Sequence, residues 1–140
     1  MKVYNGEGII LGRLAALAAK DALLGEEVQV INCEKIIISG TPVNTARWQQ
    51  DKRERKGYPL KSQIHPRVPE RIVRRAIRGM LPWKTNRGKV AFKRVMCHRG
   101  VPASLANEKP IVPANASSKK LPNLKYISVG ELARQLGGKL

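Results

Sequence analysis

The chain has 140 residues, which is enough for one domain with a modest core and too few to predict two. Its 42% of hydrophobic residues is typical of a globular protein and excludes wholesale disorder. The 27 Lys and Arg residues against 10 Asp and Glu residues give a formal net charge of +17. Self-repulsion of that size disfavours a compact state unless a polyanion neutralises it. Nucleic acid is the commonest such partner, and an anionic membrane surface is the second.

The positive charge is concentrated in the middle of the chain. Residues 1–40 contain 4 basic and 5 acidic side chains, residues 41–100 contain 17 and 3, and residues 101–140 contain 6 and 2. A near-neutral start followed by a charged middle indicates a folded element that carries a binding surface.

Other function classes find little support in the sequence. Cys33 and Cys97 are far apart, and His65 and His98 add no ligand spacing, so we expect neither a metal site nor a cofactor. No run approaches the ~20 apolar residues that cross a bilayer, and the N-terminus lacks the plan of a secretory signal. We therefore expect a cytoplasmic protein with no membrane partner.

The first predicted elements alternate between strand and helix. Residues 8–12 are an apolar run between glycines and form either a buried strand or the start of a helix. Residues 13–24 predict a helix that ends at Gly25. Residues 28–32 alternate and predict a strand, and residues 36–39 predict a second, buried strand. This order favours an α/β sheet with right-handed crossovers.

The basic middle opens with a helix start signal. Thr41 is expected to cap this helix and Pro42 to take its first position, and the helix should run to about Arg55. Residues 53–69 are rich in Lys, Arg and Pro, and we interpret them as an irregular basic loop. Two further helices are predicted, from Pro69 to near Gly79 and within residues 86–95.

Prolines interrupt residues 100–122, which show no structural period. A structureless stretch of this length is unusual in a self-contained domain. We therefore expect residues 100–123 to be an extended segment that RNA or a partner protein orders. Tyr126 begins another strand, and Ser128 with Glu131 forms a capping box for a last helix ending at Gly137. Residues 1–140 are predicted to form a single domain.

Four arginines share one face of the helix predicted from Pro69. At 100° per residue they fall within about 100° of arc, opposite a side that runs through Val73, Ile77 and Met80. One side should therefore pack into a core while the other presents guanidinium groups, which can each bind two phosphate oxygens at once. A solvated face is the alternative, but such faces usually mix signs, and here Glu70 alone is acidic. The four are Arg71, Arg74, Arg75 and Arg78.

The segment after this helix adds a second basic cluster. Lys84, Arg87 and Lys89 surround Gly88, and a glycine lets the backbone approach a phosphate chain closely. Trp83 either stacks on a base or anchors the local packing, and the same alternatives hold for Trp48 and Tyr58.

A nucleotide-dependent enzyme is the competing hypothesis. Gly6, Gly8 and Gly12 ahead of a helix resemble a dinucleotide fingerprint. That motif needs a preceding strand and an acid about 20 residues on, whereas the apolar run here falls inside the glycine motif. Carboxylates in the basic middle are few and unpaired, which gives no general acid–base site. We expect no catalysis and no small-molecule substrate.

Two segments together resemble the universal large-subunit ribosomal protein family called L-thirteen. The opening motif is Gly-Ile-Ile-Leu-Gly-Arg-Leu-Ala-Ala-Leu-Ala-Ala-Lys at residues 8–20, and the second is Ile-Arg-Gly-Met-Leu-Pro-Trp-Lys-Thr-Asn-Arg-Gly at residues 77–88. The resemblance covers about residues 3–102. Details of the second motif resemble the archaeal and eukaryotic branch, and without the long C-terminal helical extension of eukaryotic members the archaeal type is favoured.

The resemblance implies a three-layer α/β/α fold around a small, mostly parallel four-stranded sheet, with basic loops and a Pro-rich extended segment added. It also implies a structural constituent that binds large-subunit ribosomal RNA, contacts neighbouring large-subunit proteins and supports early subunit assembly. By resemblance the RNA contacts centre on Arg74, Arg75, Arg78, Lys84, Arg87 and Lys89.

The basic residues of the middle of the chain complete this predicted surface. They should neutralise phosphates, so that RNA is recognised more by shape than by base sequence. A regulatory RNA-binding role off the ribosome would leave the same sequence signals. The predicted RNA-binding residues are Arg47, Lys52, Arg53, Arg55, Lys56, Lys61, Arg67, Arg71, Arg74, Arg75, Arg78, Trp83, Lys84, Arg87, Lys89, Lys93 and Arg94.

Overall fold

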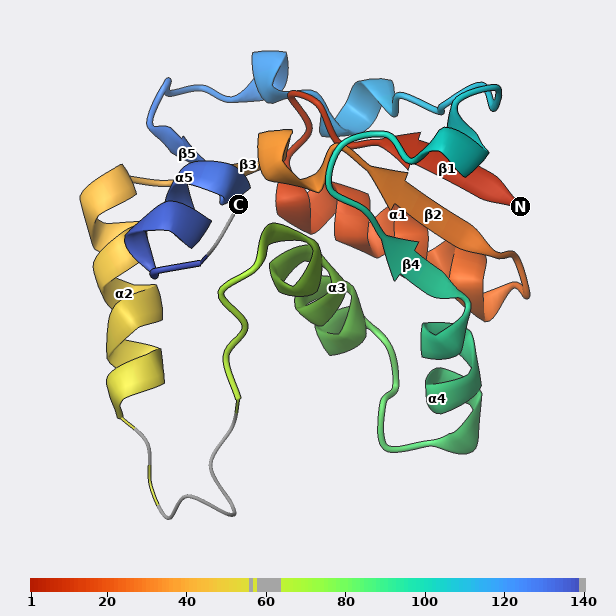
Figure 1. Ribbon diagram of the computed structural model, residues 1–140, viewed down its shortest axis with the longest axis horizontal. Coiled ribbons are helices and arrows are strands. Elements are labelled where there is room, and N and C mark those ends of the chain that lie inside the picture. The colour runs from red at the N-terminus through yellow and green to blue at the C-terminus, as the bar shows by residue number, and fades with distance from the viewer. Residues whose placement is uncertain (56, 58–63, 139–140) are drawn as a thin grey trace.

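Three short parallel strands lie at the centre of the computed structural model, which describes residues 1–55, 57 and 64–138. They are β1 (Lys2–Asn5), β2 (Val28–Ile31) and β4 (Val95–Cys97), in the spatial order β1-β2-β4. A separate antiparallel pair joins β3 (Ile37–Ser39) to β5 (Tyr126–Ser128) (Figure 1). The predicted α/β class is confirmed.

The described residues form five α-helices, and the predicted helices are confirmed to within a few residues. No helix in the described ranges is both long and apolar enough to cross a bilayer. Short 3-10 turns occupy residues 33–35, 103–105, 114–116 and 118–120. The helices are α1 (Leu11–Leu23), α2 (Pro42–Glu54), α3 (Pro69–Met80), α4 (Asn86–Lys93) and α5 (Val129–Gln135).

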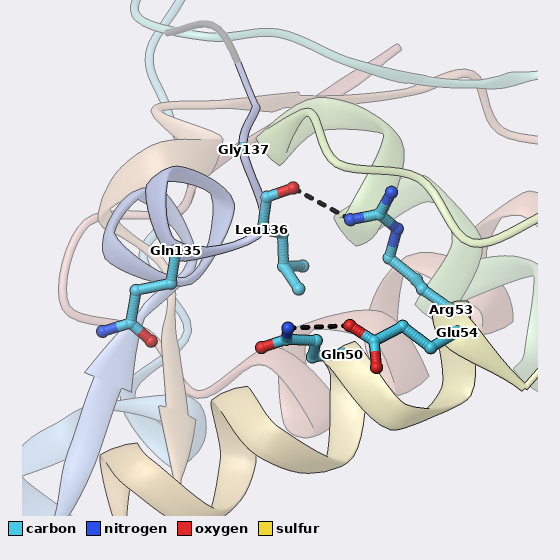
Figure 2. Close-up of a pocket in the computed structure, with 6 residues that line it drawn as sticks. All are labelled: Gln50, Arg53, Glu54, Gln135, Leu136 and Gly137. Carbon is cyan, nitrogen blue, oxygen red and sulfur yellow. Dashed lines mark hydrogen bonds between the residues drawn. The ribbon is translucent and has the colours of Figure 1, made fainter.

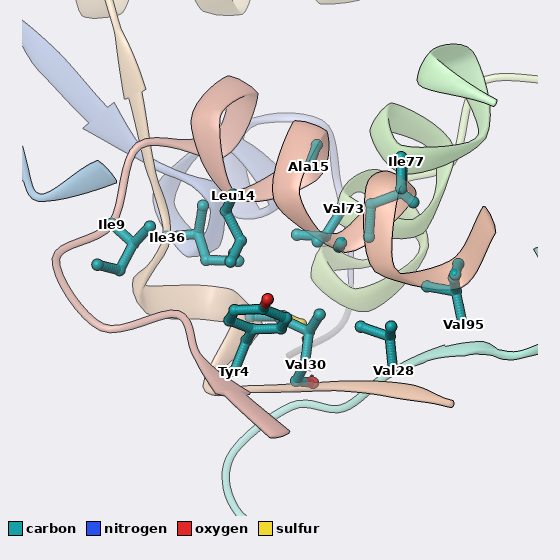
Figure 3. Packing of buried hydrophobic residues seen from close by; sticks show 14 of the residues in the cluster. Tyr4, Ile9, Leu14, Ala15, Val28, Val30, Ile36, Val73, Ile77 and Val95 are labelled. Carbon is teal, nitrogen blue, oxygen red and sulfur yellow. Dashed lines mark hydrogen bonds between the residues drawn. The ribbon is translucent and has the colours of Figure 1, made fainter. Parts of the chain in front are cut away.

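The main core lies between one face of the parallel sheet and the helices α1, α3 and α4. Because side chains alternate along a strand, Val28 and Val30 of β2 point to this face together with Tyr4 of β1. Val73 and Ile77 of α3 are fully buried in the same cluster (Figure 3). This packing fixes which side of α3 faces outward.

The three-layer prediction requires helices on the opposite face of the sheet as well. The structure covers that face in a different way. Val3 and Ile31 point to this side and pack on Leu105, which belongs to the 3-10 turn at residues 103–105. In the described residues, an irregular segment and not a helix covers these side chains. The three-layer arrangement is therefore not confirmed.

The expected four-stranded sheet is not confirmed, because the strands of the described residues form a three-stranded parallel sheet and a separate antiparallel pair. Asn32 adopts a left-handed conformation with φ of 55°, and the 3-10 turn at residues 33–35 follows it, so the chain changes direction after β2. As a result β3 does not join the parallel sheet but pairs with β5, and only an isolated bridge between Ile10 and Ile37 links β3 to the segment before α1.

The strand β1 was not predicted, and the segment after residue 100 helps to hold it. Ile111 forms a parallel bridge with Tyr4, while the backbone N–H of Asn5 donates to the Ile111 carbonyl at 3.1 Å. Further along, Ile9 pairs with Ser117. The segment thus contacts the domain itself, and its ordering by RNA or a partner protein stays a prediction.

A buried carboxylate joins α1 to β1. Asp21 accepts hydrogen bonds from the Tyr4 hydroxyl and from Lys2 Nζ, the latter at 2.9 Å. Burial by itself raises the pKa of the Asp21 carboxyl, but these two hydrogen bonds outweigh it and hold the pKa below its ordinary value of 3.8. Burial also raises the pKa of the Tyr4 hydroxyl, which therefore remains a donor.

Replacing Tyr4 by Phe should lower the free energy of unfolding at pH 7 by about 1–3 kcal/mol, because a charged acceptor loses its partner. The folded-state pKa of Asp21 is depressed, so this contribution is complete above the ordinary pKa near 3.8 and is lost as the pH falls through the depressed value. Urea unfolding of both proteins at pH 7 and pH 3 measures it. A loss of stability in Tyr4→Phe that is larger at pH 3 than at pH 7 would contradict the hydrogen bond to ionised Asp21.

Candidate nucleic-acid interface

The arginines of α3 lie on the outward side of the helix, as predicted. Val73 and Ile77 are fully buried, whereas Arg71 is exposed and the other three arginines are half-buried. Met80, the last residue of α3, lies beside α1 on the predicted apolar side, but it is 45% exposed and not buried as expected.

Aromatic rings from the neighbouring segment hold two of these arginines. The Arg74 guanidinium carbon lies 4.6 Å from the centre of the Phe92 ring, and that of Arg78 lies 4.7 Å from the Trp83 ring. The two rings meet edge to face with centroids 5.0 Å apart. A guanidinium over a ring face is attracted to it and loses freedom of movement. One cation–π contact therefore couples α3 to α4, and the other couples α3 to the turn between the two helices.

The turn between α3 and α4 is closed by a side-chain cap. Thr85 Oγ1 accepts a hydrogen bond from the Gly88 N–H at 3.2 Å and donates one to the Pro82 carbonyl at 2.8 Å. A Cβ on Gly88 would lie 2.1 Å from that carbonyl oxygen. The prediction that Gly88 opens the backbone to phosphate is wrong, since the space beside this buried glycine is filled by Pro82.

Exposed cations surround this turn. A hollow of about 460 Å³ lies beside it and is lined by Arg75, Arg78, Trp83 and Lys84 among others. Glu70 is the only acidic residue between Glu54 and Glu108, so little negative charge offsets these groups. We refer to the following residues as the α3–α4 surface: Arg71, Arg75, Arg78, Lys84, Arg87, Lys89 and Lys93.

A second group of predicted residues lies on α2, on the other side of α3 from α4 (Figure 1). Arg47, Lys52 and Arg55 are exposed, and we refer to them as the α2 surface. Lys52 Nζ lies 3.2 Å from the centre of the Trp48 ring. Thr41 occupies the N-cap position, but its side chain makes no capping hydrogen bond, contrary to expectation. Among the described residues, the predicted cations therefore fall into two groups, one on α2 and one on α3, α4 and the turn between them.

The remaining predicted residues have other positions. Arg53 and Arg94 are half-buried and donate to backbone carbonyls, Arg53 to Leu136 at 2.9 Å and Arg94 to Ala22 at 3.5 Å. Arg67 is exposed in the connection before α3. Lys56, Lys61 and Tyr58 lie outside the described residues.

Phe92 is the residue that sequence reasoning missed. It lies three residues before the end of the predicted helix in an otherwise basic stretch, and its only sequence signal is that it is an aromatic residue among cations. Its role as the platform for Arg74 depends on the approach of α4 to α3, which no local pattern reveals.

The glycine motif near the N-terminus does not form a nucleotide cradle. A strand, β1, does precede it, contrary to the sequence-based interpretation, but a Cβ on Gly6 would lie 2.5 Å from the Ile36 side chain. The backbone N–H of Ser118 donates to the Gly8 carbonyl at 2.9 Å, and that of Ile10 to Ala116 at 2.8 Å. The turn is therefore packed against other parts of the same chain. Within the described ranges, no three His, Cys, Asp or Glu residues are grouped as metal ligands.

Replacing Gly88 by Ala should force the turn at Pro82 away from α4 and lower the free energy of unfolding by about 1–3 kcal/mol, as overpacking does. Gly79 is the matched control, because it is also helical and a Cβ there meets nothing within 4 Å. Gly79→Ala should raise stability by up to about 1 kcal/mol through its helix propensity. Equal effects of the two changes in thermal or urea unfolding would contradict the close contact.

Comparison with known proteins matches residues 1–104 to the family described as Ribosomal protein L13. The large ribosomal subunit protein uL13 of Methanopyrus kandleri is 44% identical over 137 residues, covering 96% of this chain and 86% of its own length. The proteins of that name from Methanosarcina barkeri and Methanocaldococcus jannaschii are 41% and 40% identical, each comparison covering 99% of both chains. The resemblance seen in the two sequence motifs, including its archaeal type, is confirmed.

Proposed function

Since the chain belongs to the ribosomal protein L13 family, we propose that it is a structural constituent of the large ribosomal subunit in the cytoplasm. In this proposal it binds large-subunit ribosomal RNA through the basic surface of residues 41–100, contacts neighbouring large-subunit proteins and supports early assembly of the subunit. The family consists of ribosomal proteins and is not known to be enzymatic.

The α3–α4 surface is the observation that carries the RNA-binding proposal. Its cations lie on α3, on α4 and on the turn that joins them, and the neighbouring sequence supplies almost no acid to balance them. Arginine forks and lysine ammonium groups bind phosphate oxygens, and such contacts position a protein on RNA without reading its sequence. RNA helices are recognised mostly through their shape and backbone, which suits a surface of this kind.

Some of the predicted residues would contact RNA directly, and others would support the side chains that do. Lys84, Arg87 and Lys89 are exposed and would reach phosphates directly. Trp83 is half-buried, with Arg78 over its ring and Phe92 at its edge, which favours a packing role over base stacking. Arg74 lies over Phe92 and Arg94 donates to α1, so both would mainly support the surface.

Replacing Lys84, Arg87 and Lys89 together by Ala should weaken binding to large-subunit RNA and flatten its salt dependence. Each lost phosphate contact removes about 0.7–0.9 from the slope of log affinity against log salt, so three contacts change the slope by about two. Fluorescence anisotropy over a salt series measures the slope.

Lys109, Lys119 and Lys120 provide the matched control, because they are also exposed but lie in the segment after residue 100. Replacing these three by Ala removes the same charge from a different part of the protein. If both triple variants lower the slope equally, the protein binds through its overall charge, and the assignment to the α3–α4 surface is wrong.

A change at Trp83 tests whether its ring holds Arg78 for binding. Trp83→Leu should weaken RNA binding about threefold, because loss of a cation–π contact of roughly 0.5–1 kcal/mol frees the guanidinium. Trp83→Phe keeps a ring and should retain most of the affinity. Anisotropy at fixed salt gives the comparison, and thermal melting reports folding separately. Leu and Phe variants of equal affinity would show that the ring has no such role.

A further inference from the structure

A second hollow lies between the C-terminal half of α2 and the end of α5, away from the α3–α4 surface. Its volume is about 490 Å³, and Figure 2 shows the six residues that line it. Gln50, Arg53 and Glu54 come from α2, whereas Gln135, Leu136 and Gly137 come from the end of α5 and the residue pair that follows it. Two elements that are about 80 residues apart in sequence therefore meet around a space lined by both polar and apolar groups.

Hydrogen bonds within the protein hold the charged groups of this hollow in place. Arg53 Nη1 donates to the Leu136 carbonyl at 2.9 Å, and Gln50 Nε2 donates to Glu54 Oε1 at 2.8 Å. A guanidinium has five N–H donors and a carboxylate can accept several hydrogen bonds, so these contacts leave both groups able to bind a ligand. Groups anchored before binding lose less freedom when the ligand arrives.

The chemistry of the lining selects against phosphate and in favour of a nucleobase. The Glu54 carboxylate repels an anion, and together with Arg53 it makes the hollow close to neutral. Leu136 also lines the hollow (Figure 2), although most of its side chain is buried in the core with Ile127 and Leu132. A flat, uncharged heterocycle with both donors and acceptors on its edges fits these conditions.

Guanine is the base whose edges match best. Its ring N–H and its amino group are neighbouring donors on the Watson–Crick edge, and a carboxylate can accept from both. Its O6 and N7 atoms are acceptors on the major-groove edge, where arginine is their commonest partner. Adenine, cytosine and uracil each lack the adjacent pair of donors.

We propose that the hollow formed by Gln50, Arg53, Glu54 and Leu136 binds an unstacked guanine base of a single-stranded RNA segment. Sequence-specific RNA recognition mostly uses bases that are turned out of the stack and read along their edges. Arg47 lies on the same helix one turn before Gln50 and supplies a cation for an adjoining phosphate. The inference rests on the proposed RNA-binding function and deepens it, because it adds a base-selective subsite to a phosphate-binding protein.

The simpler explanation is that Arg53 only caps the end of α5. Basic side chains often bind the last carbonyls of a helix in this way. That explanation accounts for the bond to Leu136, but it assigns nothing to Glu54 or Gln50 and gives no base preference. Base preference is therefore the property to measure.

The test uses the full chain, labelled with ¹⁵N, and three RNA pentamers: pentauridylate and the same pentamer with guanine or adenine at its centre. Anisotropy should show the guanine pentamer binding about tenfold more tightly than the adenine pentamer, as a good two-bond edge contact provides. The side-chain amide signals of Gln50 and Gln135 should shift with the guanine pentamer. Glu54→Gln removes the carboxylate and should abolish most of the preference.

Glu108→Gln is the matched control, because it removes the same charge from an exposed position far along the chain and should keep the preference. If the wild-type protein binds all three pentamers equally, the guanine site is wrong while the proposed function stands. A preference that persists in Glu54→Gln, with the two glutamine signals unmoved, also overturns the site. Failure to bind any pentamer or large-subunit RNA would remove the proposed function itself.

Discussion

Val73 and Ile77 of α3 are fully buried beside α1, and the position of the basic surface depends on this contact. A helix of twelve residues is marginal in water on its own, and clustered arginines weaken it further. Burial of two branched side chains contributes roughly 1.5–3 kcal/mol each and fixes the rotation of the helix about its axis. Once that rotation is set, the helical period turns the arginines towards solvent.

These cations repel each other because they lie close together, and the neighbouring aromatic rings offset part of this repulsion. Guanidinium groups on one helix face repel each other, and Glu70 is the only acid nearby in sequence. Phe92 and Trp83 place the negative faces of their rings under Arg74 and Arg78, which offsets some of the repulsion without neutralising the surface. The buried Gly88 lets the turn that carries Trp83 approach α4 closely enough for the two rings to meet. The protein thus keeps its positive charge and still restricts its geometry.

Local patterns predicted what depends on local physics. The helical period of α3, the capping box at Ser128 and the glycine that ends α1 are short-range properties, and the structure has all three. The pairing of β3 with β5 joins residues about 90 positions apart, and no pattern within either strand specifies it. Gly88 illustrates the same limit, because its role depends on a carbonyl from the preceding turn.

The strand β1 and the segment after residue 100 were misjudged for a related reason. β1 has only four residues, with Lys2 and Asn5 at its ends, so its two buried side chains give too short a pattern to identify. The segment after residue 100 has no period because single bridges and short 3-10 turns hold it, as at Ile111 and Leu105. The amino-acid composition of this segment could not identify which residues of the domain it contacts.

The two basic surfaces differ in how the protein supports them, and this bears on how each would bind RNA. The arginines of α3 stand on a helix with a buried face, so the α3–α4 surface is largely formed before RNA arrives. No side chain of α2 is buried, and Arg53 ties the end of that helix to α5 through a single backbone carbonyl. Contacts made at α2 therefore rest on a helix with less packing behind it than α3 has. A base held between α2 and α5 would add a contact to both elements and so stabilise the part of the basic region that the core does not reach.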